Sequence, residues 1–199
     1  FLDKNGTGTT SDAIDAIYYA GQNGARVMNA SFGGGGFSQP FLDAILFARG
    51  KGALFVAAAG NGGLNNDTFP QYPSSYYADN IIAVSATDAR DALASFSNYG
   101  ALSVDIGAPG VGIVSAIRGG SYSSSSGTSM AAPHISGAAA LLFGTQPTFH
   151  FSAVREMSLA TADRASSLDG KTVSGGRLNL ARAIERALRD SDIARFVIY

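Results

Sequence analysis

The sequence feature that most limits the possible folds is a continuous apolar run, Ala53-Leu54-Phe55-Val56-Ala57-Ala58-Ala59. Because no residue in it is polar, both faces must be covered, as in an inner strand of a parallel sheet. Further strands are predicted over residues 25–31 and 81–86, and helical patterns cover residues 11–21, with Ser11 as its cap, and 40–49. This alternation predicts an α/β fold in which helices sandwich a mostly parallel sheet.

The second half of the chain adds short extended segments and three helices. A strand over residues 103–106 is expected to stop at Gly107-Ala108-Pro109-Gly110, because glycine and proline interrupt regular structure. The other elements predicted here are extended segments over residues 111–117 and 120–123 and helices over residues 130–143, 152–161 and 179–190. We detect no internal repeat and no linker, which favours a single domain.

Composition narrows the classes of function. The formal net charge is −1 and the charged residues are scattered, which argues against a nucleic-acid partner. The longest apolar run is too short to cross a bilayer, so no membrane span is predicted. The absence of cysteine excludes disulfides and thiolate metal sites. The chain begins with Phe1 rather than Met, so we expect it to be a processed or truncated piece of a longer protein.

Three loops rich in small residues contain the candidate active site. They are Ser31-Phe32-Gly33-Gly34, Ala58-Ala59-Gly60-Asn61 and Gly127-Thr128-Ser129. In a parallel sheet, chemistry sits beyond the carboxyl ends of the strands, where these loops should converge. Ser129 would lie at a helix N-terminus, where unpaired N–H groups favour the oxyanion formed when a serine attacks. The amide of Asn61 could donate to the same oxyanion, although a helix cap for Ser129 and a turn for Asn61 are the more common roles of such residues.

Two other functions fit the motifs of this sequence less well. An esterase of the α/β-hydrolase type requires Gly-x-Ser-x-Gly, but residue 131 is alanine. A dinucleotide site is suggested by Gly33 to Gly36 between a strand and a helix. The third glycine of that fingerprint is replaced by Ser38, and no acidic residue follows at the required distance.

The motifs resemble those of the subtilisin-like serine proteases, the subtilases. Residues 127–134 match the family's nucleophile signature Gly-Thr-Ser-Met-Ala-x-Pro-His, residues 58–61 its Ala-Ala-Gly-Asn, and residues 29–34 its Asn-x-Ser-x-Gly-Gly. Further similar segments occur in the same order: Tyr72-Pro73, Ala94-Ser95-Phe96-Ser97, Ala108-Pro109-Gly110 and Asn179. The resemblance implies a serine endopeptidase with a subtilisin-like fold that acts on polypeptides and is secreted.

The resemblance also implies a role for each matched position. Ser129 would be the acylating nucleophile, and Asn61 and the Ser129 N–H would form the oxyanion hole. An extended substrate would add as an antiparallel strand along Ser31, Phe32, Gly33 and Gly34. A pocket for a large apolar side chain would be walled by Ala58, Ala59 and Gly60. No cofactor is required for the chemistry, but Asp105, with Ser74 and Tyr76, matches a cation site of some relatives, so a structural Ca²⁺ is possible.

The triad's aspartate and histidine are missing from this chain. In subtilases both precede the stretch resembled here. His134 is predicted to be a structural core residue facing away from Ser129, and His150 to lie at the far end from the crevice. We therefore expect residues 1–190 to be the C-terminal two-thirds of a catalytic domain truncated at its N-terminal side. Residues 191–199 would be a tail or the start of a following segment.

The missing N-terminal part of the domain would then be a required partner of this chain, and residues 1–199 alone are expected to be inactive. The alternative is a non-catalytic pseudoprotease or a peptide-binding fragment.

Overall fold

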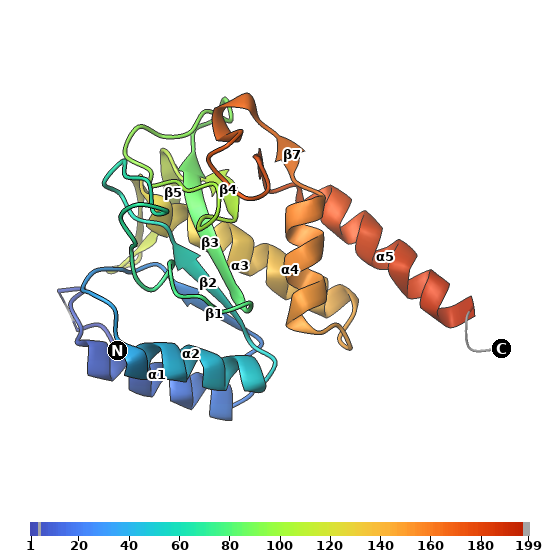
Figure 1. Ribbon diagram of the computed structural model, residues 1–199, viewed down its shortest axis with the longest axis horizontal. Helices are drawn as coiled ribbons and strands as arrows, with labels where there is room; N and C mark the ends of the chain where they lie inside the picture. Colours follow the sequence, from blue (N-terminus) through green and yellow to red (C-terminus); the bar gives the residue numbers. More distant parts are fainter. Residues whose placement is uncertain (4, 197–199) are drawn as a thin grey trace.

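The computed structural model describes residues 1–3 and 5–196, with side chains described as far as residue 189. Its centre is a six-stranded sheet with the strand order β1-β2-β3-β4-β8-β7 (Figure 1). Strands β1 to β4 are parallel, and β7 alone runs antiparallel to its neighbour. The strands are β1 Val27–Ala30, β2 Leu54–Ala58, β3 Ile81–Thr87, β4 Ile106–Pro109, β7 Asp163–Arg164 and β8 Gly176–Arg177. The predicted α/β class with a mostly parallel sheet is confirmed.

Helices cover both faces of the sheet and create two cores. α1 (Thr10–Gln22) and α2 (Gln39–Gly50) pack on one face (Figure 1). α3 (Thr128–Thr145), α4 (Phe151–Ala160) and α5 (Leu180–Phe196) lie on the other, and a 3-10 turn, η1, spans Ser166–Leu168. β2 serves both cores, because alternate strand residues point to opposite faces. Leu54, Val56 and Ala58 contact the α3 side, whereas Phe55 and Ala57 contact the α1–α2 side.

Two helix boundaries differ from the prediction, namely the start of α1 and the end of α5. α1 begins one residue earlier than predicted, because its cap is Thr9 rather than Ser11. The Thr9 hydroxyl accepts from the Asp12 N–H at 3.1 Å, and the Asp12 carboxylate accepts from the Thr9 N–H at 3.1 Å. This reciprocal capping box pairs two donors that a helix start leaves unpaired. α5 continues beyond the predicted residue 190 to Phe196, while residues 197–199 lie outside the described part of the chain.

The prediction that Gly107-Ala108-Pro109 stops a strand was wrong, since β4 consists of Ile106 and these three residues. They pair in parallel with β3 from Val84 to Thr87. Glycine is required at 107 because a side chain there would meet buried Leu168, whose Cδ1 lies 2.6 Å from the position of an ideal Cβ. Proline is tolerated at this last position because β8 pairs with β4 only at Gly107, and the adjacent bond to β3 is made by the Gly110 N–H, which donates to the Thr87 carbonyl oxygen.

The two extended segments after β4 form a separate hairpin. β5 (Ile113–Ile117) pairs antiparallel with β6 (Ser121–Ser125), outside the main sheet, and is largely exposed. The turn between them contains Gly119 and Gly120, with φ of 88° and 77°. A tight hairpin turn favours such positive φ values, which glycine adopts without strain. The sequence predicted the extended conformation but not the pairing.

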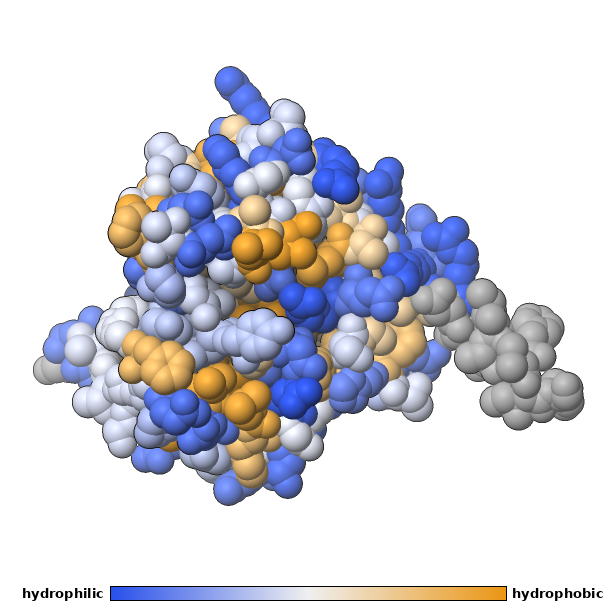
Figure 2. Space-filling model, in the orientation of Figure 1, coloured by the Kyte–Doolittle hydropathy of each residue, from blue (hydrophilic) through white to orange (hydrophobic). Residues whose placement is uncertain are grey.

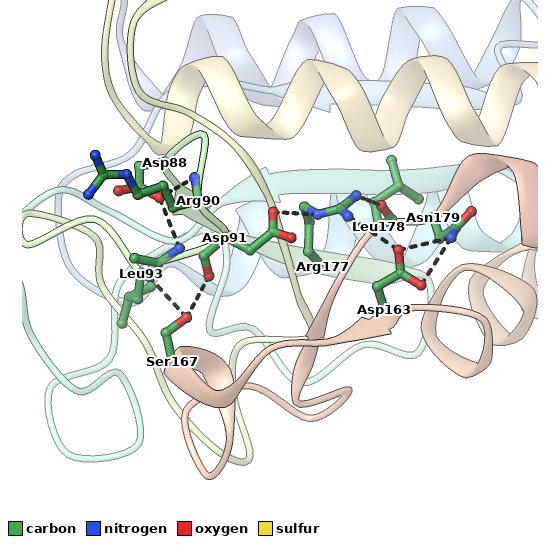
Figure 3. Close-up of polar contacts among 10 residues, drawn as sticks. Asp88, Arg90, Asp91, Leu93, Asp163, Ser167, Arg177, Leu178 and Asn179 are labelled. Atoms are coloured by element: carbon green, nitrogen blue, oxygen red, sulfur yellow. Dashed lines mark hydrogen bonds and ion pairs between the residues drawn. The ribbon is translucent and has the colours of Figure 1, made fainter.

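A polar network fastens the C-terminal segments to the loop after β3 (Figure 3). The Arg177 side chain lies between two carboxylates, with Nε 2.6 Å from Asp91 and Nη2 3.2 Å from Asp163. Asp163 also accepts from Asn179 Nδ2 at 2.9 Å. Nearby, the Ser167 hydroxyl donates to the carbonyl oxygen of Asp91 at 2.6 Å. The network therefore joins β8, β7 and η1 to the loop that follows β3.

The surface carries small hydrophobic patches separated by hydrophilic residues, one of them over α2 (Figure 2). Within the described residues, no helix combines the length and the apolar character that crossing a membrane requires.

Candidate functional site

The three predicted loops converge at one edge of the sheet. β1 and β2 are paired in parallel and end at Ala30 and Ala58, so the segments that follow them leave the sheet on the same side. The third loop arrives at Gly127, whose N–H donates to the carbonyl oxygen of Gly110, just beyond β4, at 2.8 Å. Ser129 then lies half-buried in the first turn of α3. Its backbone N–H is one of the helix-start donors that no helical carbonyl can pair.

Asn61 is fixed against this helix start by Thr128. Its Oδ1 accepts from the Thr128 N–H at 2.8 Å and from the Thr128 hydroxyl at 3.0 Å. The same hydroxyl accepts from the Gly60 N–H at 3.1 Å, so one threonine holds two successive residues of the loop. Among the described residues, Asn61 Nδ2 has no hydrogen-bond acceptor. This amide therefore offers a donor beside the turn that carries Ser129.

The expected substrate strand is tied to the turn that carries Ser129. The Ser31 hydroxyl donates to the carbonyl oxygen of Ser129 at 2.8 Å and accepts from Asn29 Nδ2 at 2.8 Å. Asn29 Oδ1 in turn accepts from the Ser136 hydroxyl of α3 at 2.8 Å. Phe32 is half-buried, and Gly33 and Gly34 are exposed. Residues 31–34 follow β1 without regular strand structure; Ser31 is held in place, and the Gly34 N–H donates to the Tyr72 carbonyl oxygen at 3.2 Å.

A cavity of about 390 Å³ opens beside this strand. Aromatic and glycine residues dominate its lining, among them Phe32, Gly33, Phe41, Tyr72 and Tyr76. Tyr72 and Tyr76 are in contact, with ring centroids 4.5 Å apart. Of the three expected pocket-wall residues, Gly60 is half-buried, whereas Ala58 and Ala59 are 7% and 0% exposed. None of these three residues lines the cavity, whose other wall is formed by the N-terminal segment from Phe1 to Ala13.

Two buried asparagines that the sequence did not reveal support the loop of Asn61. Asn98 Oδ1 accepts from the Gly62 N–H at 2.8 Å and from the Leu64 N–H at 3.0 Å. Asn98 Nδ2 donates to Asn66 Oδ1 at 2.9 Å, and Asn66 Nδ2 donates to the carbonyl oxygen of Ala59 at 2.9 Å. Both side chains belong to residues only 1% exposed. The only signal was that Asn98 directly follows the family-like segment that ends at Ser97.

Neither histidine lies where a base for Ser129 would be needed. His134 is exposed, so its prediction as a core residue was wrong, and its Nδ1 is 2.9 Å from the Met130 carbonyl oxygen. The face of α3 that packs on the sheet carries Ala131, Ala132 and Ile135, which leaves position 134 outside. His150 caps the start of α4, beyond the far end of α3. α3 rises about 24 Å from Ser129 to its last residue.

Asp105, the candidate cation ligand, is buried and paired within the protein. One oxygen forms an ion pair with Arg155, and the other accepts from the Ala83 N–H at 2.7 Å. Burial raises the pKa of the Asp105 carboxyl, and the Arg155 guanidinium opposes this effect. Ser74 donates to the Gln71 carbonyl oxygen, and the Tyr76 hydroxyl accepts from the Ser38 N–H. This arrangement does not fit a cation held by Asp105, and the described residues contain no group of three or more His, Cys, Asp or Glu that could hold a metal.

Known proteins match almost the whole chain. Residues 1–182 match the subtilase family, Peptidase S8. The thermophilic serine proteinase of Bacillus sp. (strain AK1) is 47% identical over 183 residues, covering 92% of this chain and 43% of the relative. Thermitase of Thermoactinomyces vulgaris is 40% identical over 184 residues, covering 92% of this chain and 63% of the relative. This chain therefore spans less than two thirds of either relative.

A solved structure of the prenylagaramide maturation protease PagA has the same fold. The TM-score is 0.81 at 31% identity, with 94% of this chain and 70% of that chain covered. The esterase and dinucleotide-binding alternatives are therefore excluded as the family of this chain. The match over residues 1–182 and the shared fold show that the chain belongs to the subtilase family.

Proposed function

We propose that this chain forms the nucleophile and oxyanion-hole part of a serine endopeptidase, which cleaves polypeptides through an acyl-enzyme intermediate on Ser129. The observation that carries the proposal is the pair of Thr128 hydrogen bonds that orient Asn61 beside the start of α3. They hold the Asn61 side chain next to the helix start that carries the Ser129 N–H, and Asn61 Nδ2 has no acceptor among the described residues. Two donors fixed before the reaction are what an acyl-transfer oxyanion requires.

The proposed reaction proceeds in two balanced steps. In the first, Ser129 Oγ bonds to the carbonyl carbon of the scissile peptide, and its proton passes to a general base. The Asn61 amide and the Ser129 N–H stabilise the resulting oxyanion; the C–N bond then breaks and the amine leaves with that proton. In the second, water attacks the acyl group, and a carboxylic acid and free Ser129 are released. No step requires a metal or another cofactor.

We further propose that the general base and its aspartate come from sequence preceding Phe1, and that residues 1–199 alone are inactive. The position of His150 beyond α3 and the exposure of His134 support this assignment. So does the greater length of the relatives, of which this chain spans 43% and 63%. Secretion, which the resemblance to subtilases implies, stays a prediction.

The substrate is proposed to bind as an extended strand along Ser31 to Gly34. Backbone pairing gives affinity for any polypeptide, while side-chain pockets supply preference. The aromatic cavity beside the strand, bordered by Phe32, Phe41 and Tyr76, favours a large apolar side chain. Profiling of cleavage sites tests this point, and enrichment of charged residues at every substrate position near the cut would contradict it.

Kinetics of peptide hydrolysis test the function in the chain joined to its natural preceding sequence. Asn61→Ala should lower kcat by about 10²–10³ with little change in KM, the range known for the corresponding asparagine of subtilisin, a member of this family. Ser129→Ala should abolish acylation, and Asn23→Ala, on the exposed end of α1, should leave both constants unchanged. An unchanged kcat in Asn61→Ala would overturn the oxyanion role, and no turnover in the unsubstituted protein would favour the pseudoprotease.

A further inference from the structure

Asn61 is followed by glycine, and this makes its side chain prone to deamidation, a reaction separate from the proposed catalysis. The chain contains three Asn-Gly sequences, at Asn5, Asn23 and Asn61. Asparagine is a thermolabile residue, and glycine in the next position leaves the backbone nitrogen sterically free. That nitrogen can attack the side-chain carbon Cγ and expel ammonia. The cyclic imide that forms is opened by water to aspartate or isoaspartate.

The carbonyl group under attack is already polarised in Asn61. Two Thr128 donors, N at 2.8 Å and Oγ1 at 3.0 Å, point at Asn61 Oδ1. Donors placed in this way stabilise the negative charge that develops on a carbonyl oxygen when a nucleophile adds to its carbon. Asn61 and Gly62 are both exposed, so water can reach the site to accept a proton and to open the imide.

The attacking nitrogen, in contrast, is held by Asn98. The Gly62 N–H donates to Asn98 Oδ1 at 2.8 Å. Asn98 is itself held in place, because its Nδ2 donates to Asn66 Oδ1 at 2.9 Å and its backbone N–H donates to the Gly60 carbonyl oxygen at 2.9 Å. The hydrogen bond between Gly62 and Asn98 must break before the nitrogen can turn to Asn61 Cγ and release its proton.

We propose that Asn61 is a latent deamidation site and that Asn98 keeps it unreacted by holding the Gly62 N–H. In the reaction, the bond from Gly62 N to Asn61 Cγ forms and the Cγ–Nδ2 bond breaks. The proton from Gly62 N passes to water, and Nδ2 departs as ammonia after taking up a proton. The aspartate produced has no amide donor and carries a negative charge. If the proposed function holds, deamidation therefore switches off the oxyanion hole.

The test compares deamidation at the three Asn-Gly sites by mass spectrometric peptide mapping of residues 1–199 incubated at mildly alkaline pH. The Ser129→Ala background prevents self-cleavage, so the outcome does not depend on protease activity. In the chain with Asn98 intact, Asn61 should react more slowly than Asn5, because the attacking Gly6 N–H makes only a longer bond of 3.1 Å, to the Asp3 carbonyl oxygen in an exposed turn, against 2.8 Å from Gly62 to Asn98. Asn98→Ala should raise the ratio of the Asn61 rate to the Asn5 rate by about fivefold or more, the value of one lost hydrogen bond.

Asn80→Ala is the matched control, because Asn80 is as buried as Asn98 but donates to the carbonyl oxygens of Ile45 and Ala53, away from the loop of Asn61. It should change the ratio much less. Adding Gly62→Ala to Asn98→Ala should remove the Asn61 product, since it obstructs the attacking nitrogen. Equal effects of the Asn80 and Asn98 substitutions would overturn the proposal in favour of a general loss of stability.

A measurement on the chain with Asn98 intact tests the proposal even if the Asn98→Ala variant fails to fold. Hydrogen exchange of the Gly62 N–H should be slow compared with that of Gly36 in the exposed loop before α2. Exchange at the rate of an open loop would show that Asn98 does not hold this group and would overturn the proposal.

Discussion

The Ser31 hydroxyl hydrogen bonds at 2.8 Å to the carbonyl oxygen of Ser129, 98 residues later in the chain. In an uninterrupted α-helix this oxygen would accept from the N–H of the residue four positions on. That residue is Pro133, which lies inside α3 and has no N–H. Ser31 therefore supplies the donor that the helix lacks, and the expected substrate strand becomes fastened to the turn of the expected nucleophile.

This relationship predicts a coupling between positions 31 and 133. Ser31→Ala should lower the free energy of unfolding by about 1–3 kcal/mol, because the Ser129 carbonyl oxygen loses its partner. The loss should be smaller in a Pro133→Ala background, where residue 133 donates instead. A double-mutant cycle in denaturant measures the coupling, which we expect to exceed about 0.5 kcal/mol. Ser115→Ala in the exposed hairpin serves as the control. Additive effects at positions 31 and 133 would argue against this exchange of donors.

Two glycines are predicted to respond to alanine with opposite signs. A Cβ at Gly110 would lie 2.6 Å from Ala86 Cβ and 2.8 Å from the Gly127 carbonyl oxygen. Gly110→Ala should therefore destabilise by about 1–3 kcal/mol. Gly137, inside α3, has no atom within 4 Å of its ideal Cβ, so alanine there should stabilise by about 0.5–1 kcal/mol. Urea denaturation of both variants decides the matter, and a neutral Gly110→Ala would contradict the close packing at the site edge.

The capping box of α1 predicts a pH-dependent contribution to stability. Hydrogen bonds from the Thr9 hydroxyl and N–H lower the pKa of Asp12 below its ordinary 3.8. A lowered carboxyl pKa contributes stability that is present above the unfolded pKa and lost as pH falls through the folded pKa. Asp12→Ala should therefore be less stable than the unsubstituted chain at neutral pH, and the difference should shrink well below pH 3.8. A difference that does not change with pH would show that the carboxylate charge plays no part.

The network in Figure 3 predicts that Asp163 is important for stability. Its carboxylate accepts from Arg177, Asn179 and Arg182, at 3.2, 2.9 and 3.1 Å. Asp163→Ala should destabilise by about 1–3 kcal/mol, since three donors lose an ionised acceptor. Glu156→Ala removes an exposed pair with Arg186 and should cost about 0.2–1 kcal/mol. Thermal unfolding of both variants gives the comparison, and equal effects would mean that the Asp163 network is no stronger than an ordinary surface pair.

Local patterns in the sequence were sufficient to predict the framework of the site. The apolar run of β2 indicated a strand covered on both faces, and the parallel arrangement then implied that the loops after β1 and β2 meet at one edge with the turn of Ser129. The structure confirms that convergence through the parallel pairing of β1 with β2 and the bond from Gly127 to Gly110. The helix behind Ser129 was predicted over residues 130–143, and it spans Thr128–Thr145.

What could not be predicted depended on contacts distant in sequence. β4 includes residues that ordinarily end strands, because β3 pairs with them and Leu168 packs over Gly107. The exposure of His134 depends on which side of α3 faces the sheet, which helix periodicity alone does not determine. The support of the Asn61 loop by Asn98 depends on a bond between Gly62 and Asn98, which are 36 positions apart in the sequence. No motif marks such a partner in advance.

The most direct measurement of the central claim is labelling with a serine-directed fluorophosphonate, read by intact mass and located by peptide mapping. It is applied to residues 1–199, to the same residues joined to their natural preceding sequence, and to the Ser129→Ala form of each. We predict one label on Ser129 in the longer protein, none in its Ser129→Ala form, and none in residues 1–199 despite a folded state. A label on another residue of the longer protein, or none, would contradict Ser129 as its nucleophile. Labelling of Ser129 in residues 1–199 would place the general base within this chain.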